Sequence, residues 1–176
     1  MKKLFGLVLS LFTIFLCASC SESKQEITEK QVCNLLDDYY AALRADDFEA
    51  YCDCFPQFYV DAMNEEIEEF DNDFWSQIQD SFIEIYGEEF EIDYELIKME
   101  RISDEGIEDA KRSMASAFRI GKPNLTAAYL VTYKETVSGN SVKNEYNDLT
   151  IIAVKIDEVV YLYDTIYELD ESDFAA

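Results

Sequence analysis

Apolar side chains recur every three to four residues between positions 26 and 86, which is the spacing of amphipathic helices. The spacing predicts a helix over residues 26–44 that starts with a capping box of Thr28 and Gln31. A short second helix, DFEAYCDCF, is expected next, capped by Asp46. Two further helices are expected before Gly87, a natural stop. Their apolar positions are Val60, Met63, Ile67 and Phe70, then Phe74, Ile78, Phe82 and Ile85.

The period changes to two in the stretch FEIDYEL, which starts at Phe90, and this alternation is typical of a half-buried strand. The strand is expected to run to about Ile102, where Ser103 caps another helix that ends before Gly121. Three more strands should follow, with tight turns at Ser138-Gly139-Asn140 and Asp157-Glu158. Their expected ranges are 125–137, 142–156 and 159–167.

The order of these elements predicts the fold class. Helices come first, and an antiparallel four-stranded sheet follows with one helix inserted after its first strand, which indicates an α+β fold. We expect the N-terminal helices to pack on a curved sheet as a half-cone with a pocket at its mouth. A single domain should span residues 27–168, and residues 169–176 should form an acidic tail.

The chain begins with the layout of a secretory signal. Lys2 and Lys3 precede an apolar run over residues 4–16, and the small residues Ala18 and Ser19 follow. The run is shorter than the roughly 20 residues that a spanning helix needs. The sequence therefore predicts export across a membrane.

The last residues of this segment, Ala18-Ser19-Cys20, resemble the lipobox of bacterial lipoproteins, although Cys17 stands where that family prefers leucine. The resemblance implies a signal peptide over 1–19, cleavage after Ser19, a diacylglyceryl group on Cys20 and a lipidated tether over 20–26. Acyl chains such as palmitate would then hold the protein on the outer face of the cell membrane. Two alternatives stay open: ordinary secretion with cleavage after Ala18 or Ser19, and an uncleaved N-terminal anchor.

The composition of the chain excludes some classes of partner and of catalytic site. Without residues 1–19 the chain has 12 Lys and Arg against 38 Asp and Glu, a net charge of −26. Such a surface repels nucleic acid, so no nucleic-acid partner is expected. The acidic stretch over residues 61–95 would be either a site for cations or basic partners or a solvated face, and we favour the solvated face. The chain has no histidine, which excludes Ser-His-Asp and Cys-His catalysis and histidine-based zinc sites.

Three cysteines remain beyond Cys17 and Cys20. Cys33, Cys52 and Cys54 are an odd number, so at least one thiol would stay unpaired in an exported protein. We interpret them as small buried hydrophobic residues. A disulfide from Cys33 to Cys52 or Cys54 is the open alternative.

Three segments resemble the nuclear-transport-factor-two-like superfamily, a cystatin-like α+β cone that also includes ketosteroid isomerases and polyketide cyclases. They are LLDDYYAALRADDFEAYCDCF, FEIDYELI and AVKIDEVVYLYD. In the last, Glu158 replaces the family's usual turn glycine. The chain is also similar to small lipoproteins of unknown function from Gram-positive bacteria that carry this fold. None of these segments is a catalytic signature.

We therefore expect a non-catalytic lipoprotein that binds a small ligand, a peptide or a partner protein, with no cofactor and no metal site. The alternative is a small isomerase- or cyclase-like enzyme with an Asp base and Tyr donors in the cone. Tyr94, Tyr129 and Tyr133 are the candidate pocket-lining residues under either hypothesis. The segment Asp71-Asn72-Asp73 lacks the glycine and closing glutamate of a calcium loop.

Overall fold

The computed structural model of the 176-residue chain describes residues 26–66 and 72–163. The expected signal peptide, Cys20, the segment Asp71-Asn72-Asp73 and the acidic tail lie wholly or partly outside these residues. So do the last residues of the expected fourth strand, 164–167. No helix in the two described stretches has the length and apolar character to cross a bilayer.

Helices come first and strands follow, as expected. The helices are α2 (Glu29–Ala45), α3 (Phe48–Asp53), α4 (Gln57–Glu66), α5 (Asn72–Tyr86) and α6 (Asp104–Ala117). The strands are β1 (Glu91–Arg101), β2 (Leu125–Gly139), β3 (Val142–Ile156) and β4 (Val159–Tyr163). The sheet is antiparallel with the order β1-β2-β3-β4, and α6 is inserted between β1 and β2. The predicted α+β class and helix insertion are confirmed.

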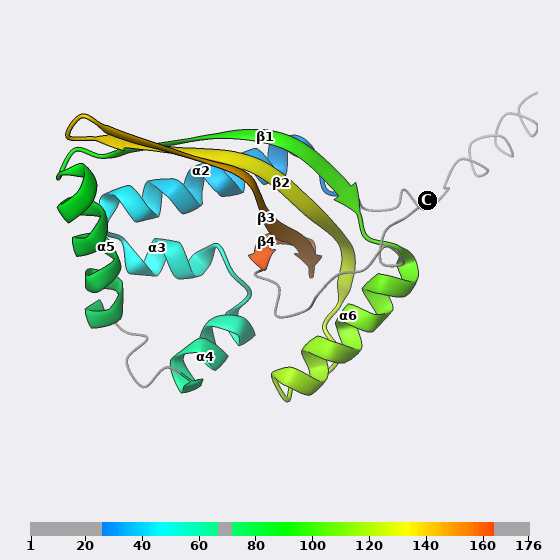
Figure 1. Cartoon of the computed structure of the whole chain (residues 1–176). Coiled ribbons are helices and arrows are strands. Elements are labelled where there is room, and N and C mark those ends of the chain that lie inside the picture. Colours follow the sequence, from blue (N-terminus) through cyan, green and yellow to red (C-terminus); the bar gives the residue numbers. More distant parts are fainter. Residues whose placement is uncertain (1–25, 67–71, 164–176) are drawn as a thin grey trace, which may run out of the picture.

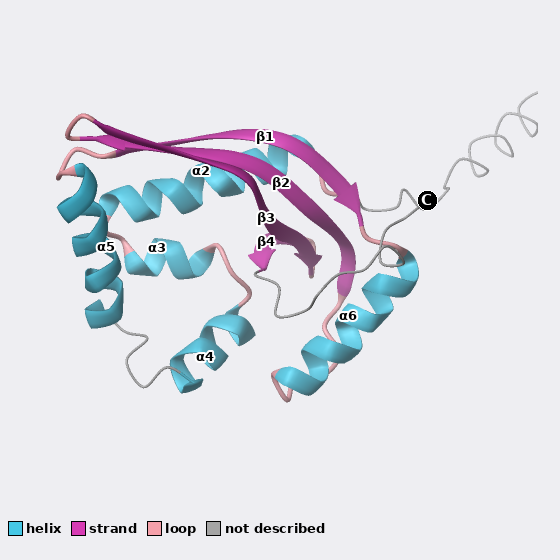
Figure 2. Ribbon diagram, viewed as in Figure 1, coloured by secondary structure: helices cyan, strands magenta, loops and turns pink. Residues whose placement is uncertain are grey.

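The long strands β2 and β3 bend over the helices (Figure 1). Helices α2 and α3 lie beneath the curved sheet, α5 stands at the end with the β2–β3 hairpin, and α6 lies at the other end (Figure 2). Side chains of β2 on opposite faces of the sheet pack into two different hydrophobic clusters. Val131 packs in the cluster with Leu36 of α2, and Ala128 packs in the cluster with Met114 of α6. The sheet is therefore buried on both faces for part of its length.

The helix starts follow the capping chemistry of the sequence with one correction. Thr28 and Gln31 form the expected capping box, and Ser103 accepts a hydrogen bond from the Gly106 amide at 3.0 Å. The N-cap of α3 is Asp47, which accepts from the Ala50 amide at 3.0 Å, so the prediction of Asp46 is wrong. Asp46 instead ends α2 in the left-handed conformation, φ 54°.

The β2–β3 turn lies one residue later than predicted. Asn140 and Ser141 are its two central residues, and both have positive φ, 45° and 66°. A turn with two such residues matches the right-handed twist of the flanking strands. Because the turn is formed by Asn140 and Ser141, Gly139 remains in β2. The predicted Asp157-Glu158 turn is confirmed, again with positive φ at both residues.

Helix α5 buries only part of the predicted face: Ile78 and Phe82 are half-buried, and Phe82 packs against the core. Trp75 and Gln79 are buried, whereas Ile85 is 53% exposed. Gln79 donates from Nε2 to the Leu43 carbonyl at 2.6 Å, and the Trp75 ring packs 5.7 Å from that of Phe48. These contacts with α2 and α3 fix the rotation of α5, which periodicity alone cannot set.

Three irregularities interrupt the strand pairing. Strand β1 has an extra residue, Ile97, between Leu96 and Lys98. Strand β2 has an extra residue, Thr126, opposite the adjacent residues Lys155 and Ile156 of β3. Opposite Tyr133 and Glu135 of β2, strand β3 has one extra residue between Leu149 and Tyr146. All three are β-bulges, which change the face that later side chains occupy. Among the described residues, strand β4 pairs only with Ile152–Ile156, and its Leu162 amide donates to the Cys54 carbonyl at 2.8 Å.

Candidate functional site

A cavity of about 200 Å³ lies among the four N-terminal helices and the sheet. Ile151 of β3 contributes from the sheet, and the remaining lining comes from α2 to α5 and the α3–α4 linker. The lining residues are Tyr39, Tyr51, Cys52, Phe55, Tyr59, Val60, Met63, Trp75, Ile78 and Ile151.

Aromatic rings form most of the wall and pack on one another. The Tyr51 ring lies 5.3 Å from that of Tyr39 and 4.7 Å from that of Trp75, centroid to centroid. Phe55 and Tyr59 stack at 5.6 Å with 23° between their planes. Such pairs add stability beyond the area they bury, so the rings are held in place without a ligand. The cavity wall is thus largely preformed.

The polar groups of the wall are uncharged at neutral pH. Burial, followed by the charge and hydrogen bond of Tyr51, raises the pKa of Tyr39 well above its ordinary value. Burial and the nearby Asp53 carboxylate raise the pKa of the Cys52 thiol. No Asp or Glu is among the described residues that line the cavity. The wall can therefore offer apolar contact and neutral hydroxyl groups, but no charge.

The single tryptophan is part of this wall. Trp75 is 3% exposed, and its indole nitrogen has no hydrogen-bond partner among the described residues. The nitrogen itself is buried, so a molecule in the cavity would meet the ring and not the N–H group. Because the chain has one tryptophan, its fluorescence reports on this cavity alone.

A hydrogen bond between Tyr40 of α2 and the Glu135 carboxylate of β2 joins the helix to the sheet. Tyr40 donates from its hydroxyl to Glu135 Oε2 at 2.6 Å, and the Tyr40 ring stacks on that of Tyr94 at 5.7 Å. Burial and then the Glu135 hydrogen bond raise the pKa of Tyr40 far above its ordinary value. The pair fixes the rotation of α2 against β2.

The structure places the three predicted tyrosines around α2. The Tyr94 hydroxyl lies 2.8 Å from the Cys33 carbonyl oxygen and 2.8 Å from Asp37 Oδ1, so it ties β1 to α2. Tyr133 is buried in the same core cluster as Tyr40. Tyr129 is half-buried, and burial raises its pKa. None of the three is among the residues that line the cavity.

Sequence reasoning did not single out the residues that do line it. Tyr39 was expected on the apolar face of α2, and Trp75 was not singled out at all. Their convergence depends on the rotation of α5 and on the α3–α4 connection, both set by contacts distant in sequence. The one usable signal was the density of aromatic residues between positions 39 and 59.

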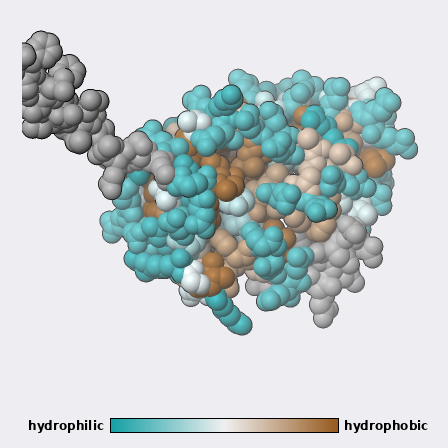
Figure 3. All heavy atoms as spheres, turned by 180° about the vertical axis from the view of Figure 1, so that it is seen from behind, coloured by the Kyte–Doolittle hydropathy of each residue, from teal (hydrophilic) through white to brown (hydrophobic). Residues whose placement is uncertain are grey.

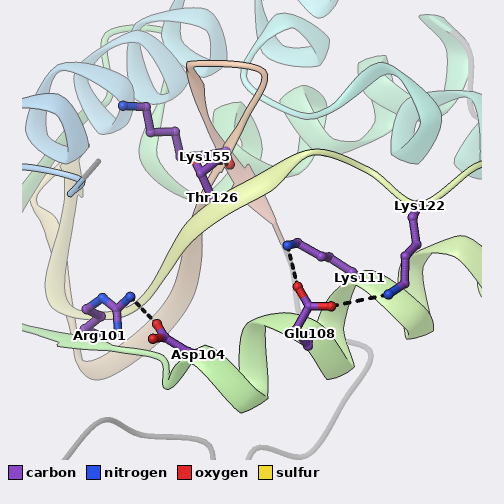
Figure 4. Close-up of polar contacts among 7 residues, drawn as sticks. All are labelled: Arg101, Asp104, Glu108, Lys111, Lys122, Thr126 and Lys155. Carbon is purple, nitrogen blue, oxygen red and sulfur yellow. Dashed lines mark hydrogen bonds and ion pairs between the residues drawn. The ribbon is translucent and has the colours of Figure 1, made fainter. Parts of the chain in front are cut away.

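Charge is distributed unevenly over the molecule. The sequence of α3, α4 and α5 has no Lys or Arg, whereas cations gather near α6. There, Glu108 lies between Lys111 and Lys122 at 2.6 and 3.3 Å, and these ammonium groups lower its pKa (Figure 4). The cations near α6 are thus matched by local acids. Seen from behind, the surface is mostly hydrophilic, with apolar side chains gathered in the middle (Figure 3).

The three cysteines of the described region are free thiols. Cys54 is buried, and its Sγ lies 3.5 Å from the Ala50 carbonyl oxygen as a donor. Burial, with the charges of Asp38 and Asp53, raises the pKa of Cys54 to about 12. Within residues 26–66 and 72–163, no three Cys, Asp or Glu side chains come together as metal ligands would.

Comparison with protein-family models, curated proteins and solved structures finds no match for this chain. The resemblance to the nuclear-transport-factor-two-like superfamily therefore stays a prediction, and so does the lipobox at Cys20. What the structure itself provides is an α+β fold with an aromatic cavity beneath its curved sheet.

Proposed function

We propose that the protein is a lipoprotein anchored through Cys20 to the outer face of a cell membrane, which binds a small, uncharged, largely apolar molecule without transforming it. The observation that carries the binding proposal is the uncharged aromatic wall of the cavity formed by α2 to α5 and β3. The anchor rests on the sequence of the first 20 residues, and two acyl chains suffice for stable attachment.

The size and chemistry of the cavity limit the ligand. A cavity of roughly 150 Å³ lined by apolar side chains accepts benzene, so the volume of about 200 Å³ suits a molecule with one ring. Anions would be repelled by the acidic chain, and a cation would find no carboxylate in the described wall. A neutral ring with one hydroxyl or carbonyl group fits both conditions, because tyrosine hydroxyls such as that of Tyr39 can meet the polar group.

The same wall argues against acid–base catalysis. General acids and bases work best when their pKa lies near the operating pH. The pKa values of Tyr39 and Cys52 are raised, which keeps both groups protonated and unreactive as bases. An isomerase- or cyclase-like reaction would need a carboxylate at the ligand, and the described wall holds none. Binding is therefore the function that this geometry supports best.

The test uses the full chain in a non-ionic detergent, with cyclohexanol as the probe. Cyclohexanol is neutral, has one ring and does not fluoresce, so saturable change in Trp75 emission would report its entry into the cavity. Ile78→Phe should fill part of the space and weaken binding by about tenfold or more, since the added ring excludes the probe. Ile97→Phe, at the exposed bulge of β1, is the matched control and should bind normally.

Two results would overturn the binding proposal: emission that changes without saturating, or equal responses from Ile78→Phe and the control. Native mass spectrometry of the protein extracted from its own membrane tests the anchor separately. An N-terminus at Cys20 with acyl mass supports the anchor, and an unacylated N-terminus contradicts it.

A further inference from the structure

A second hollow lies further along α5, between the last turns of that helix and the β2–β3 hairpin. Its volume is about 270 Å³, and it shares no lining residue with the aromatic cavity. We name it the hairpin groove. Its lining residues are Ser81, Phe82, Ile85, Tyr86, Glu135, Val137, Tyr146 and Leu149.

The bulge in β3 builds one wall of the hairpin groove. Residues of a regular strand share a face only when an even number of positions separates them. Tyr146 and Leu149 are three positions apart, yet both line the groove. They pair with Glu135 and Tyr133, which are two positions apart, so the extra residue in β3 restores the common face. The β3 bulge therefore places Tyr146 and Leu149 together in the wall of the groove.

Large apolar side chains at the rim are exposed to water. Ile85 is 53% exposed and Tyr146 is 43% exposed, although both contact the hollow. The Tyr146 ring is also held in place, because its hydroxyl lies 3.4 Å from that of Tyr86, which accepts from Asn144 Nδ2 at 2.6 Å. A fixed, exposed aromatic ring at an open hollow is typical of preformed ligand sites.

One carboxylate, that of Glu135, is the only charged group among the described residues that line the hairpin groove. Glu135 is half-buried, and its Oε2 accepts the Tyr40 hydroxyl from the core side. Among the described residues no Lys or Arg forms an ion pair with Glu135. Its neighbour Glu145 differs, since Lys134 and Lys143 both lie 3.1 Å from its oxygens. The α5 wall supplies no cation either, because that helix has no Lys or Arg.

We propose that the hairpin groove is a binding site for a small organic cation, an amine on an apolar body. Its ammonium group would pair with Glu135 and lie against the rings of Phe82, Tyr86 and Tyr146, which attract cations through their π faces. Its apolar body would cover the exposed part of Ile85. The acidic surface of the whole chain raises the local concentration of such cations. This site is independent of the neutral ligand proposed for the aromatic cavity.

The test compares two probes of nearly equal shape on the full chain in a non-ionic detergent. Phenethylamine is protonated at neutral pH, and 2-phenylethanol is its uncharged counterpart. Backbone amide chemical shifts at the last turns of α5 and at the β3 bulge report on the hairpin groove separately from the aromatic cavity. At these amides the amine should saturate at about tenfold lower concentration than the alcohol, as expected for a paired cation on aromatic rings. Trp75 emission should stay constant when the amine is added, and a change caused by the alcohol would report its entry into the aromatic cavity.

Two variants and a control decide the assignment. Glu135→Gln keeps an oxygen for the Tyr40 hydroxyl but removes the charge, and Tyr146→Leu removes a ring that is already exposed. Each should weaken amine binding by about tenfold and leave the alcohol unaffected. Glu49→Gln removes one exposed charge on α3 and should change affinity within about twofold.

Equal losses in Glu135→Gln and Glu49→Gln would overturn the site, because the attraction would then belong to the acidic molecule as a whole. Equal affinity for the amine and the alcohol would also overturn it, as would shifts centred on the aromatic cavity. Absence of binding by the amine at millimolar concentration would do the same.

Discussion

The carbonyl oxygen of Tyr86 occupies the space that a side chain at Gly139 would need. A Cβ atom on Gly139 would lie 2.1 Å from this oxygen, well inside any contact that two such atoms tolerate. Tyr86 ends α5 and Gly139 ends β2, so this contact sets how closely the helix approaches the hairpin. Tyr86 also lines the hairpin groove.

We predict that Gly139→Ala destabilises the fold by about 1–3 kcal/mol, the usual cost of forcing an extra methyl group into packed structure. Urea denaturation followed by circular dichroism would measure it. Gly121→Ala is the matched control, because a Cβ there meets no atom within 4 Å. If both variants unfold at the same urea concentration, the contact between α5 and the hairpin is not tight in solution.

The buried tyrosine Tyr40 and the buried thiol Cys54 predict a loss of stability at alkaline pH. Their pKa values are raised in the folded state, so the folded chain keeps protons that the unfolded chain has already released. Each group contributes its full stability below its ordinary pKa, and the free energy of unfolding falls above about pH 9 because of Cys54 and above about pH 10 because of Tyr40 as well. The loss is about 1.4 kcal/mol per pH unit for each group. The free energy of unfolding, measured by urea titration between pH 8 and pH 11 in steps of about half a unit, should decline throughout the upper part of that range. A Tyr40→Phe chain should show a shallower decline, and an equal decline would exclude Tyr40 as a cause.

The hydrogen bond from Tyr40 to Glu135 should matter at neutral pH too. Tyr40→Phe removes the donor and leaves the Glu135 carboxylate without it, at a cost of about 1.5–3 kcal/mol for a bond to a charged group. The melting temperature should fall accordingly. Tyr161→Phe is the control, since the half-buried Tyr161 hydroxyl has no partner in the part of the chain that the structure describes. Equal melting temperatures for the two variants would mean that water replaces the Tyr40 bond at no cost.

Of the three free thiols Cys33, Cys52 and Cys54, the buried Cys54 should resist alkylation in the folded protein. The pKa of Cys54 is raised to about 12, and the thiolate is the reactive form, so iodoacetamide at pH 8 should modify it far more slowly than a free thiol. In urea all three thiols should react alike. Peptide mass spectrometry resolves the sites. A disulfide-linked peptide that joins Cys33 to Cys54 would contradict the free thiols seen here.

Replacement of Cys20 tests the proposed anchor. Cys20→Ser cannot receive the diacylglyceryl group, so the chain should lose its acyl mass and move from the membrane fraction to the medium. Cys17→Ser is the control, and it should keep both the mass and the membrane location. A Cys20→Ser chain that stays in the membrane would favour an uncleaved N-terminal anchor.

Sequence patterns predicted the local features of this fold well. The capping box at Thr28, the cap at Ser103 and the helix stop before Gly87 depend on neighbouring residues, and all are present in the structure. The Asp46 cap failed because two adjacent aspartates offered the same chemistry, and Asp47 took the role. The alternation in β1 held only to the bulge at Ile97.

The sites themselves were not predictable from such patterns. Tyr40 and Glu135 are 95 positions apart, and no spacing rule links them. Ile85 has helical spacing to Ile78 and Phe82, which predicted burial, yet packing of Trp75 and Gln79 rotates it to the surface. Long-range packing thus decided which apolar residues became core and which became the rim of a groove.

The bulge in β3 also affects the tendency of the protein to aggregate at high local concentration. In the part of the chain that the structure describes, β4 pairs with only the last five residues of β3, Ile152–Ile156, so the outer side of its first ten residues has no strand beside it. A flat, unpaired strand of this length would recruit strands of other molecules and lead to aggregation. The extra residue bends the strand near Asp148, and the charged Lys143 and Glu145 precede the bend. The feature that shapes the hairpin groove thereby also keeps crowded copies from joining into one continuous sheet.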